Sequence, residues 1–207
     1  MEIGTRERII EHAAWQFLDN GIKNITMDEL AEQLGMSKRT IYEFFKDKKE
    51  LVMESMNFLT KKRSAIHKEV YETAENSFDA LLKLYKANQE GLIKVSRKFA
   101  DDLKKYFPEA NQNREESKKK LHDGLLITFQ KAMDEGFILK SLNPSVLSYL
   151  LTEEIFYILD ENQFKDKLKF MEIYETMCLT FFRGIATNKG REIINRYFDE
   201  NKQEEKL

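Results

Sequence analysis

Cysteine and proline are scarce in this chain of 207 residues, which contains one cysteine, two prolines and eight glycines. The single cysteine, Cys178, excludes an intramolecular disulfide framework and any zinc cluster built from cysteines. It is consistent with a reducing compartment. Because proline breaks helices and glycine weakens them, the low numbers of both residues favour long uninterrupted elements.

A large excess of charge of one sign is also absent. Lys and Arg number 34 and Asp and Glu number 36, so the formal net charge is 34 − 36 = −2. This balance excludes a protein coated all over with basic residues, but it leaves room for a local basic patch. The chain has no run of about 18 apolar residues and no apolar N-terminal segment, so we expect neither a membrane span nor a signal peptide, and a cytoplasmic location.

Apolar residues recur with the spacing of an α-helix along almost the whole chain, and no segment shows the sustained alternation that is typical of strands. We therefore expect an all-α fold. The predicted helices lie at about 5–20, 27–34, 38–44, 48–74, 78–106, 109–135, 144–160, 165–186 and 191–198, with a frayed polar tail at 201–207. The weak helix formers in 109–135 leave open an internal break in that helix.

Two short helices near the N-terminus have strong start and stop signals. Thr26 and Glu29 form a capping box, and Ile25 and Leu30 occupy the positions of a hydrophobic staple. Gly35 is placed to end this helix, and a serine follows as the cap of the next one. A short helix, a tight turn and a second short helix make a helix-turn-helix, whose second helix enters the major groove of DNA.

The second short helix and its flanks are locally basic. Residues 35–49 contain five basic and two acidic side chains, which sum to 5 − 2 = +3 in a protein of net charge −2. Contacts to DNA phosphates need such a patch. A capping box or a basic stretch alone indicates only a helix start or a solvated surface, so neither feature decides the function by itself.

Residues 5–52 resemble the N-terminal DNA-binding domain of the TetR family of bacterial transcriptional repressors. The length of the chain, its helical pattern and the stretch FFRGIATNKGREI near the C-terminus are similar to this family as well. The positions that carry the resemblance are Thr26, Leu30, Ala31, Gly35, Met36, Ser37, Thr40, Ile41, Tyr42, Phe45, Lys48 and Leu51.

The resemblance implies two groups of DNA contacts. The side chains that would enter the groove are Lys38, Arg39 and Thr40. The side chains that would hold the phosphate backbone are Thr26, Tyr42 and Lys48. The Arg39 guanidinium could donate to O6 and N7 of one guanine, which contributes about 1–3 kcal/mol of discrimination between bases.

The resemblance also implies two domains with different functions. We expect a helix-turn-helix DNA-binding domain at 2–62, with the helix-turn-helix itself at 25–44, and a larger helical bundle for ligand binding and dimerisation at 63–200. The predicted helices at 144–160 and 165–186 are apolar almost all round, which indicates a second buried face on each. We expect them to form a two-fold interface between two copies of the chain; burial within one chain is the alternative. The candidate interface residues are Leu147, Leu151, Ile155, Tyr174, Met177 and Phe181.

The resemblance implies, finally, a pocket that binds a small, often apolar inducer. The candidate lining residues are Phe58, Tyr85, Phe99, Phe129 and Met133, for any of which ordinary core packing is the alternative. We expect a dimeric repressor that binds a pseudo-palindromic operator and is released by a small molecule of unknown identity. The sequence leaves activation of transcription open.

Other functional classes have less support in the sequence. No phosphate-binding glycine loop, zinc-protease motif, di-iron pair or nucleophile elbow is present, so we expect no enzyme activity, no metal and no cofactor. The alternative function is that of an interaction protein of the same fold, whose bundle works through a protein partner. A preformed cavity favours the ligand, whereas a packed interior with an exposed apolar patch favours the partner.

Overall fold

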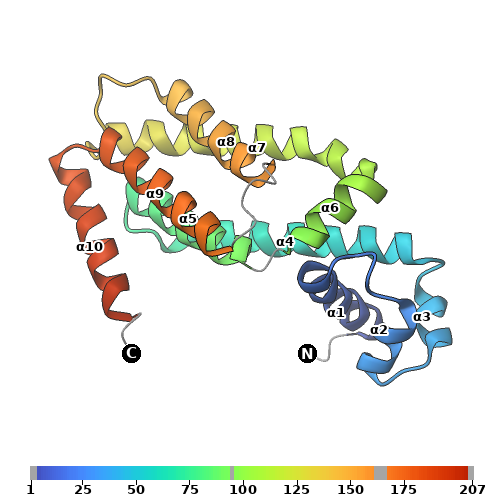
Figure 1. Cartoon of the computed structure of the whole chain (residues 1–207). Helices are drawn as coiled ribbons and strands as arrows, with labels where there is room; N and C mark the ends of the chain where they lie inside the picture. Colours follow the sequence, from blue (N-terminus) through green and yellow to red (C-terminus); the bar gives the residue numbers. More distant parts are fainter. Residues whose placement is uncertain (1–3, 94–95, 161–166, 205–207) are drawn as a thin grey trace. The chain divides into compact units, whose positions relative to one another are not determined.

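The computed structural model describes residues 4–93, 96–160 and 167–204, and within these ranges it is built from ten helices (Figure 1). The only strand-like feature within those ranges is one isolated bridge between Ile138 and Ala186. The all-α prediction is confirmed. The helices are α1 (Thr5–Asn20), α2 (Met27–Leu34), α3 (Lys38–Phe44), α4 (Lys48–Thr73), α5 (Ser77–Ile93), α6 (Arg97–Tyr106), α7 (Pro108–Asp134), α8 (Pro144–Asp160), α9 (Lys167–Ile185) and α10 (Asn188–Glu204).

The chain folds into two compact units, which differ from the sequence-based division at residue 62. The N-terminal unit comprises Met1–His67 and Gly91–Asn113, and the C-terminal unit comprises Lys68–Glu90 and Arg114–Leu207. The segment around α6 thus belongs with α1–α3. The physical reason is that Phe99 and Phe107, both buried, pack into the core that α1 and α2 form.

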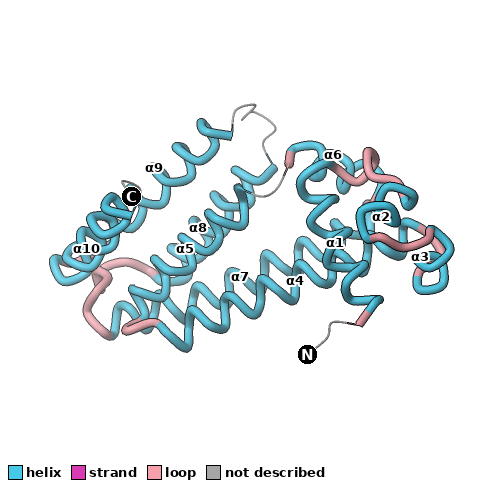
Figure 2. The backbone as a smooth tube through the Cα atoms, turned by 90° about the horizontal axis from the view of Figure 1, so that it is seen from below, coloured by secondary structure: helices cyan, strands magenta, loops and turns pink. Residues whose placement is uncertain are grey.

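The core of the N-terminal unit is formed by the apolar stripe of α1 together with the inner faces of α2, α3 and α6. In Figure 2, α6 lies beside α1, where the two helices are in contact. The backbone N–H of Ser96 donates to the carbonyl of Leu18 at 2.8 Å, and the N–H of Lys23 donates to the Asp102 carboxylate at 2.6 Å. These bonds attach the start and middle of α6 to the end of α1.

The α2–turn–α3 segment follows its sequence signals closely. The Thr26 side chain accepts from the N–H of Glu29, and the Glu29 carboxylate accepts in return from the N–H of Thr26. This exchange lowers the pKa of Glu29, chiefly through the backbone hydrogen bond. Gly35 ends α2 in the left-handed conformation at φ 66°, and Ser37 caps α3. The predicted helix-turn-helix geometry is confirmed.

Two helix predictions were wrong, at 78–106 and at 191–198, and the helix predicted at 109–135 is confirmed. The range 78–106 contains two helices, α5 and α6, because Ser96 caps α6 and its backbone bonds to α1 instead of continuing α5. The internal break left open in 109–135 does not occur, since α7 runs from Pro108 to Asp134. The last helix is longer than 191–198: α10 begins at Asn188 and reaches Glu204, so residues 201–204 of the predicted frayed tail are helical. Residues 205–207 lie outside the described residues.

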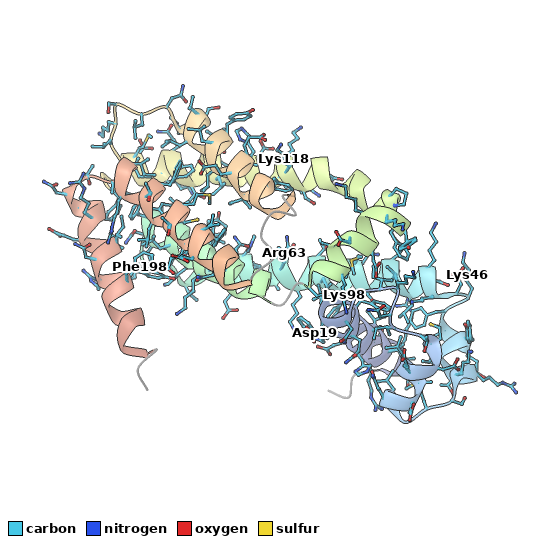
Figure 3. The ribbon with its side chains drawn as sticks, viewed as in Figure 1. Asp19, Lys46, Arg63, Lys98, Lys118 and Phe198 are labelled. Carbon is cyan, nitrogen blue, oxygen red and sulfur yellow. The ribbon has the colours of Figure 1, made fainter. Side chains whose placement is uncertain are left out.

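The C-terminal unit is held together by aromatic contacts among α5, α7, α9 and α10. Tyr85 of α5 stacks on Tyr174 of α9 at 5.4 Å between ring centroids, and Phe198 of α10 lies 6.2 Å from the Tyr85 ring (Figure 3). On α7, Phe129 lies 6.1 Å from Phe181 of α9. Cys178 is buried beside Tyr174, and burial raises the pKa of its thiol to about 12. This thiol is therefore protonated and unreactive in the folded chain.

The junction between α9 and α10 packs against the turn that follows α7. The Thr187 hydroxyl donates to the carbonyl of Gly136 at 2.8 Å, and the Lys189 ammonium donates to the carbonyl of Glu135 while lying 4.0 Å from the Phe137 ring centroid. A Cβ atom on Gly190 would stand 2.4 Å from the Phe137 carbonyl oxygen. The absence of a side chain at Gly190 is what permits this close packing.

Replacing Gly190 with alanine is expected to destabilise the chain by about 1–3 kcal/mol, because the new methyl group forces two backbone segments apart. Gly124 provides the matched control. It lies inside α7 with open space around its missing Cβ, so Gly124→Ala is expected to stabilise the chain by about 0.5–1 kcal/mol through helix propensity. Urea unfolding followed by circular dichroism measures both effects. Equal effects of the two substitutions would contradict the tight packing at Gly190.

Candidate functional site

The outward surface of α3 carries the side chains that the sequence assigned to DNA recognition. Ile41 of α3 and Phe45, which follows it, are fully buried and hold the helix against α1 and α2. The opposite side presents Arg39, whose side chain is 90% exposed, together with the exposed rings of Tyr42 and Phe44. The helix therefore offers one guanidinium and two aromatic rings to a partner that approaches from outside.

The two basic residues at the start of α3 are engaged in exposed ion pairs. The Lys38 ammonium lies 2.7 Å from the Asp28 carboxylate of α2, and this hydrogen bond raises the pKa of Lys38. The Arg39 guanidinium lies 3.4 Å from the Glu43 carboxylate, one turn along the same helix. Exposed pairs of this kind contribute little to stability, because water screens the two charges. Both cations are thus available to exchange a carboxylate for a phosphate or a base at little cost.

Thr26 and Thr40 serve as parts of helix caps. The Thr26 hydroxyl donates to the Glu29 carboxylate at 2.9 Å and accepts from the N–H of the same residue. Thr40 is half-buried, and its hydroxyl lies 2.9 Å from that of Ser37. Their side chains are therefore oriented by the local fold, at the exposed N-terminal ends of α2 and α3.

Lys48, at the start of α4, bonds to the backbone of the turn between α1 and α2. Its ammonium donates to the carbonyl of Ile22 at 2.5 Å and to the carbonyl of Ile25, and it lies 5.9 Å from the centre of the Phe17 ring. Burial lowers the pKa of Lys48, with Asp102 and Glu29 acting in the opposite direction. The structure thus gives Lys48 a role in folding that the sequence pattern did not reveal, because the two carbonyls lie 23 and 26 residues away in the chain.

A further basic side chain is that of Lys46, which lies exposed in the turn between α3 and α4 (Figure 3). Phe44 and the carboxylates of Asp28 and Glu43 are additional parts of the surface. The helical period of α3 predicts that Phe44 is exposed. The pairing of Asp28 with Lys38, in contrast, depends on how α2 crosses α3. The sequence alone contains no signal for that pairing.

The candidate ligand residues divide between the two units. Phe58 and Phe99 belong to the N-terminal unit, where they pack on or within the core of α1 and α2. Tyr85, Phe129 and Met133 are buried in the C-terminal unit. The structure therefore gives Phe58 and Phe99 a packing role in the N-terminal core.

Buried oxygen atoms without hydrogen-bond partners mark the interior of the C-terminal unit. Among the described residues they include the Tyr85 hydroxyl of α5 and, on α8, the Thr152 hydroxyl and one carboxylate oxygen of Glu154. Burial raises the pKa of both Tyr85 and Glu154. A buried polar atom left unpaired costs about 1–3 kcal/mol, so these groups are available to bind a polar ligand. Sequence reasoning identified Tyr85 but neither residue of α8.

The candidate dimer residues differ in how far they are buried within the single chain. Leu147, Leu151 and Tyr174 are buried within the single chain, and Ile155, Met177 and Phe181 are half-buried. The exposed apolar side chains of α8 are instead Val146, Tyr149 and Leu150, at 51, 57 and 44% exposure. We call these three residues the α8 patch.

The exposed positions of α9 differ from the prediction of an apolar surface all round. Where its side chains are described, they are polar residues: Glu172, Glu175, Thr176, Thr180 and Arg183. The expected second apolar face is therefore present on α8, but on α9 it is reduced to half-buried side chains between polar ones.

Within residues 4–93, 96–160 and 167–204, no helix is long and apolar enough to cross a membrane. Over the same ranges, no group of three or more His, Cys, Asp or Glu side chains is arranged to hold a metal ion.

Comparison with known proteins places these surfaces in context. Residues 9–54 match the family of bacterial regulatory proteins described as the tetR family. The chain is 31% identical over 136 residues to the HTH-type transcriptional regulator YhgD of Bacillus subtilis, covering 60% of this chain and 71% of that protein. It is 23% identical over 168 residues to the HTH-type transcriptional regulator YvaF of the same organism, covering 80% and 88%. A transcriptional regulator from Cytophaga hutchinsonii has a similar fold, with a TM-score of 0.71 and 21% identity over 89% of this chain and all of that one.

Proposed function

Because this chain belongs to the TetR family of bacterial transcriptional regulators, we propose that it represses transcription as a dimer bound to a pseudo-palindromic operator and is released by a small molecule. In this proposal α3 of each copy enters the major groove of one half-site, and the half-sites lie about one helical turn of DNA apart. The proposal includes a cytoplasmic location and no catalytic activity.

The observation that supports the proposal most strongly is the outward surface of α3. A recognition helix needs an inner side that fixes its position and an outer side that is free to read bases. Ile41 supplies the buried side, and the almost fully exposed Arg39 guanidinium supplies the free one. Tyr42 and Lys46 are candidate contacts to the DNA backbone on the same surface as Arg39. The N-terminal ends of α2 and α3 add backbone N–H donors.

Replacing Arg39 with alanine is expected to lower operator affinity by about tenfold to one hundredfold and to relax the preference at one base pair, since the bidentate contact to guanine is lost. Glu43→Ala is the matched control. It removes the carboxylate that pairs with Arg39 and that would repel phosphate, so operator affinity should stay equal or rise. Fluorescence anisotropy on operator variants measures both substitutions. An unchanged base preference in Arg39→Ala would remove Arg39 from the readout.

The proposed route from effector to DNA uses the helices that belong to both units. The residues of α4 divide between the N-terminal and C-terminal units after His67, those of α5 after Glu90 and those of α7 after Asn113. We propose that the effector favours a shift of α4 that changes the spacing of the two recognition helices. An effector acts only through its difference in affinity for the two states, so it must bind the released state more tightly.

The proposed effector site is the interior of the C-terminal unit. Its candidate contacts are therefore limited to residues of that unit. The Tyr85 hydroxyl and the unpaired oxygens of Thr152 and Glu154 are supporting observations, because a ligand that donates hydrogen bonds would satisfy them. Phe129 and Met133 stay as apolar candidates. Retention of full operator affinity in the presence of a bound effector would contradict this part of the proposal.

A second candidate function is that of a regulator controlled by a protein partner. The α8 patch supports it, because contiguous exposed apolar side chains mark interaction surfaces. The close stacking of Tyr85 on Tyr174 inside the C-terminal unit also supports it, because a packed interior favours a protein partner over a ligand. The oligomeric state distinguishes the two readings of the patch: a dimer that covers it leaves no apolar surface for another protein.

A further inference from the structure

The junction of α9 and α10 contains a small cavity lined by two arginines. Its volume is about 280 Å³, and its lining residues are Arg183 of α9 and Arg191, Ile194 and Asn195 of α10. All four belong to the C-terminal unit, where α9 and α10 are in contact. None of them belongs to the surface of α3, to the α8 patch or to the buried oxygen atoms described above.

The two arginines of this cavity form no ion pair among the described residues, because neither has a carboxylate of those residues within ion-pair distance. Residues 183–196 contain four basic side chains and one acidic side chain, a sum of 4 − 1 = +3 in a protein of net charge −2. Two guanidiniums at one cavity repel each other unless an anion lies between them.

The helix ends at the junction add to the positive potential. Arg191 stands close to the beginning of α10, where the helix dipole already presents its positive end, and the first turn of α10 contains no acidic residue. A cation at this place is unfavourable for the helix itself. Its position is explained if an anion occupies the cavity in the working protein.

We propose that this cavity binds a small anion through Arg183 and Arg191, with Asn195 as an additional hydrogen-bond donor. The shared chemistry of the ligand is a carboxylate or phosphate group, whose oxygen atoms match the fork of guanidinium N–H donors. Ile194 is fully buried and contributes an apolar part to the lining of the cavity. The site is separate from the proposed effector site and does not depend on DNA binding.

The test measures anion binding by the full chain at constant ionic strength. Inorganic phosphate and succinate are titrated separately, in each case replacing chloride, and binding is followed by isothermal titration calorimetry and by the Tm. We expect saturable binding of at least one of the two anions, with a rise of about 4 °C or more in Tm at one hundred times Kd. The anion that binds distinguishes a phosphate ligand from a carboxylate ligand.

Three variants locate the site. Arg183→Gln and Arg191→Gln are each expected to weaken binding about tenfold or more, because each removes a charge-assisted hydrogen bond. Arg196→Gln removes the same charge from an exposed position of α10 outside the cavity, so it should keep the affinity within about twofold. Circular dichroism of each variant verifies the fold. The absence of saturable binding of both anions, or an equal loss in Arg196→Gln, would overturn the proposal.

Discussion

Replacing Leu150 with glutamate is expected to give a folded monomer that binds the operator at least about 100-fold more weakly than the parent protein. Leu150 belongs to the α8 patch and is 44% exposed in the single chain, so the substitution costs little in the monomer. In a two-fold interface the new carboxylate would be buried and would face its own copy. An unpaired buried charge opposes association strongly, and an operator held by only one recognition helix loses the second half-site.

Leu139 provides the control for this experiment. It is a leucine of the same unit with a similar exposure of 37%, but it lies in the turn before α8 and outside the patch. Leu139→Glu should therefore stay dimeric and bind the operator normally. Sedimentation equilibrium and anisotropy measure the two properties. If Leu150→Glu stays a dimer of parental strength, the α8 patch is not the interface, and its role as a docking site for another protein gains support.

Replacing Lys48 with methionine is expected to destabilise the N-terminal unit by about 2–5 kcal/mol. Methionine keeps most of the apolar stem but has no donor, so the carbonyls of Ile22 and Ile25 lose the ammonium that binds them. Each buried carbonyl without a partner costs about 1–3 kcal/mol, and the total stability of a protein is only about 5–15 kcal/mol. Operator binding should fall at temperatures at which this unit begins to unfold.

The comparison with Lys46→Met separates folding from phosphate binding. Lys46 lies two residues earlier, is exposed and loses the same charge, so it should weaken DNA binding and flatten the salt dependence without lowering stability. Urea unfolding curves and affinities at several salt concentrations give both quantities. Equal stability of the two variants would show that Lys48 acts only on DNA and that its bonds to the α1–α2 turn contribute nothing.

Local signals explain why the helix-turn-helix could be predicted to the residue. The Thr26–Glu29 capping box, the glycine at position 35 and the serine cap of α3 each act on groups no more than four residues away, and local chemistry of this kind is visible in a sequence. The separation of α5 from α6 is different. It depends on a bond from Ser96 to Leu18, 78 residues away, which no periodicity can indicate.

The candidate site shows the same contrast. The exposure of Arg39 and Tyr42 follows from the helical period, because Ile41 and Phe45 must face inward. The ion pair of Lys38 with Asp28 depends on the crossing of two helices, as does the capture of Lys48 by two carbonyls. The placement of Phe58 and Phe99 in the N-terminal core was likewise a question of packing, since aromatic residues look alike in a sequence whether they line a pocket or fill a core.

The most direct test of the central claim is binding of the purified protein to the DNA upstream of its own gene. We predict a protected segment that is a pseudo-palindrome, with half-sites about one helical turn apart and an affinity that falls steeply with salt. The parent protein and Arg39→Ala are footprinted side by side, and Arg39→Ala should protect the same segment only at about tenfold to one hundredfold higher protein concentration. Failure of the parent protein to bind any double-stranded DNA at low salt would contradict the account of α3 as a recognition helix.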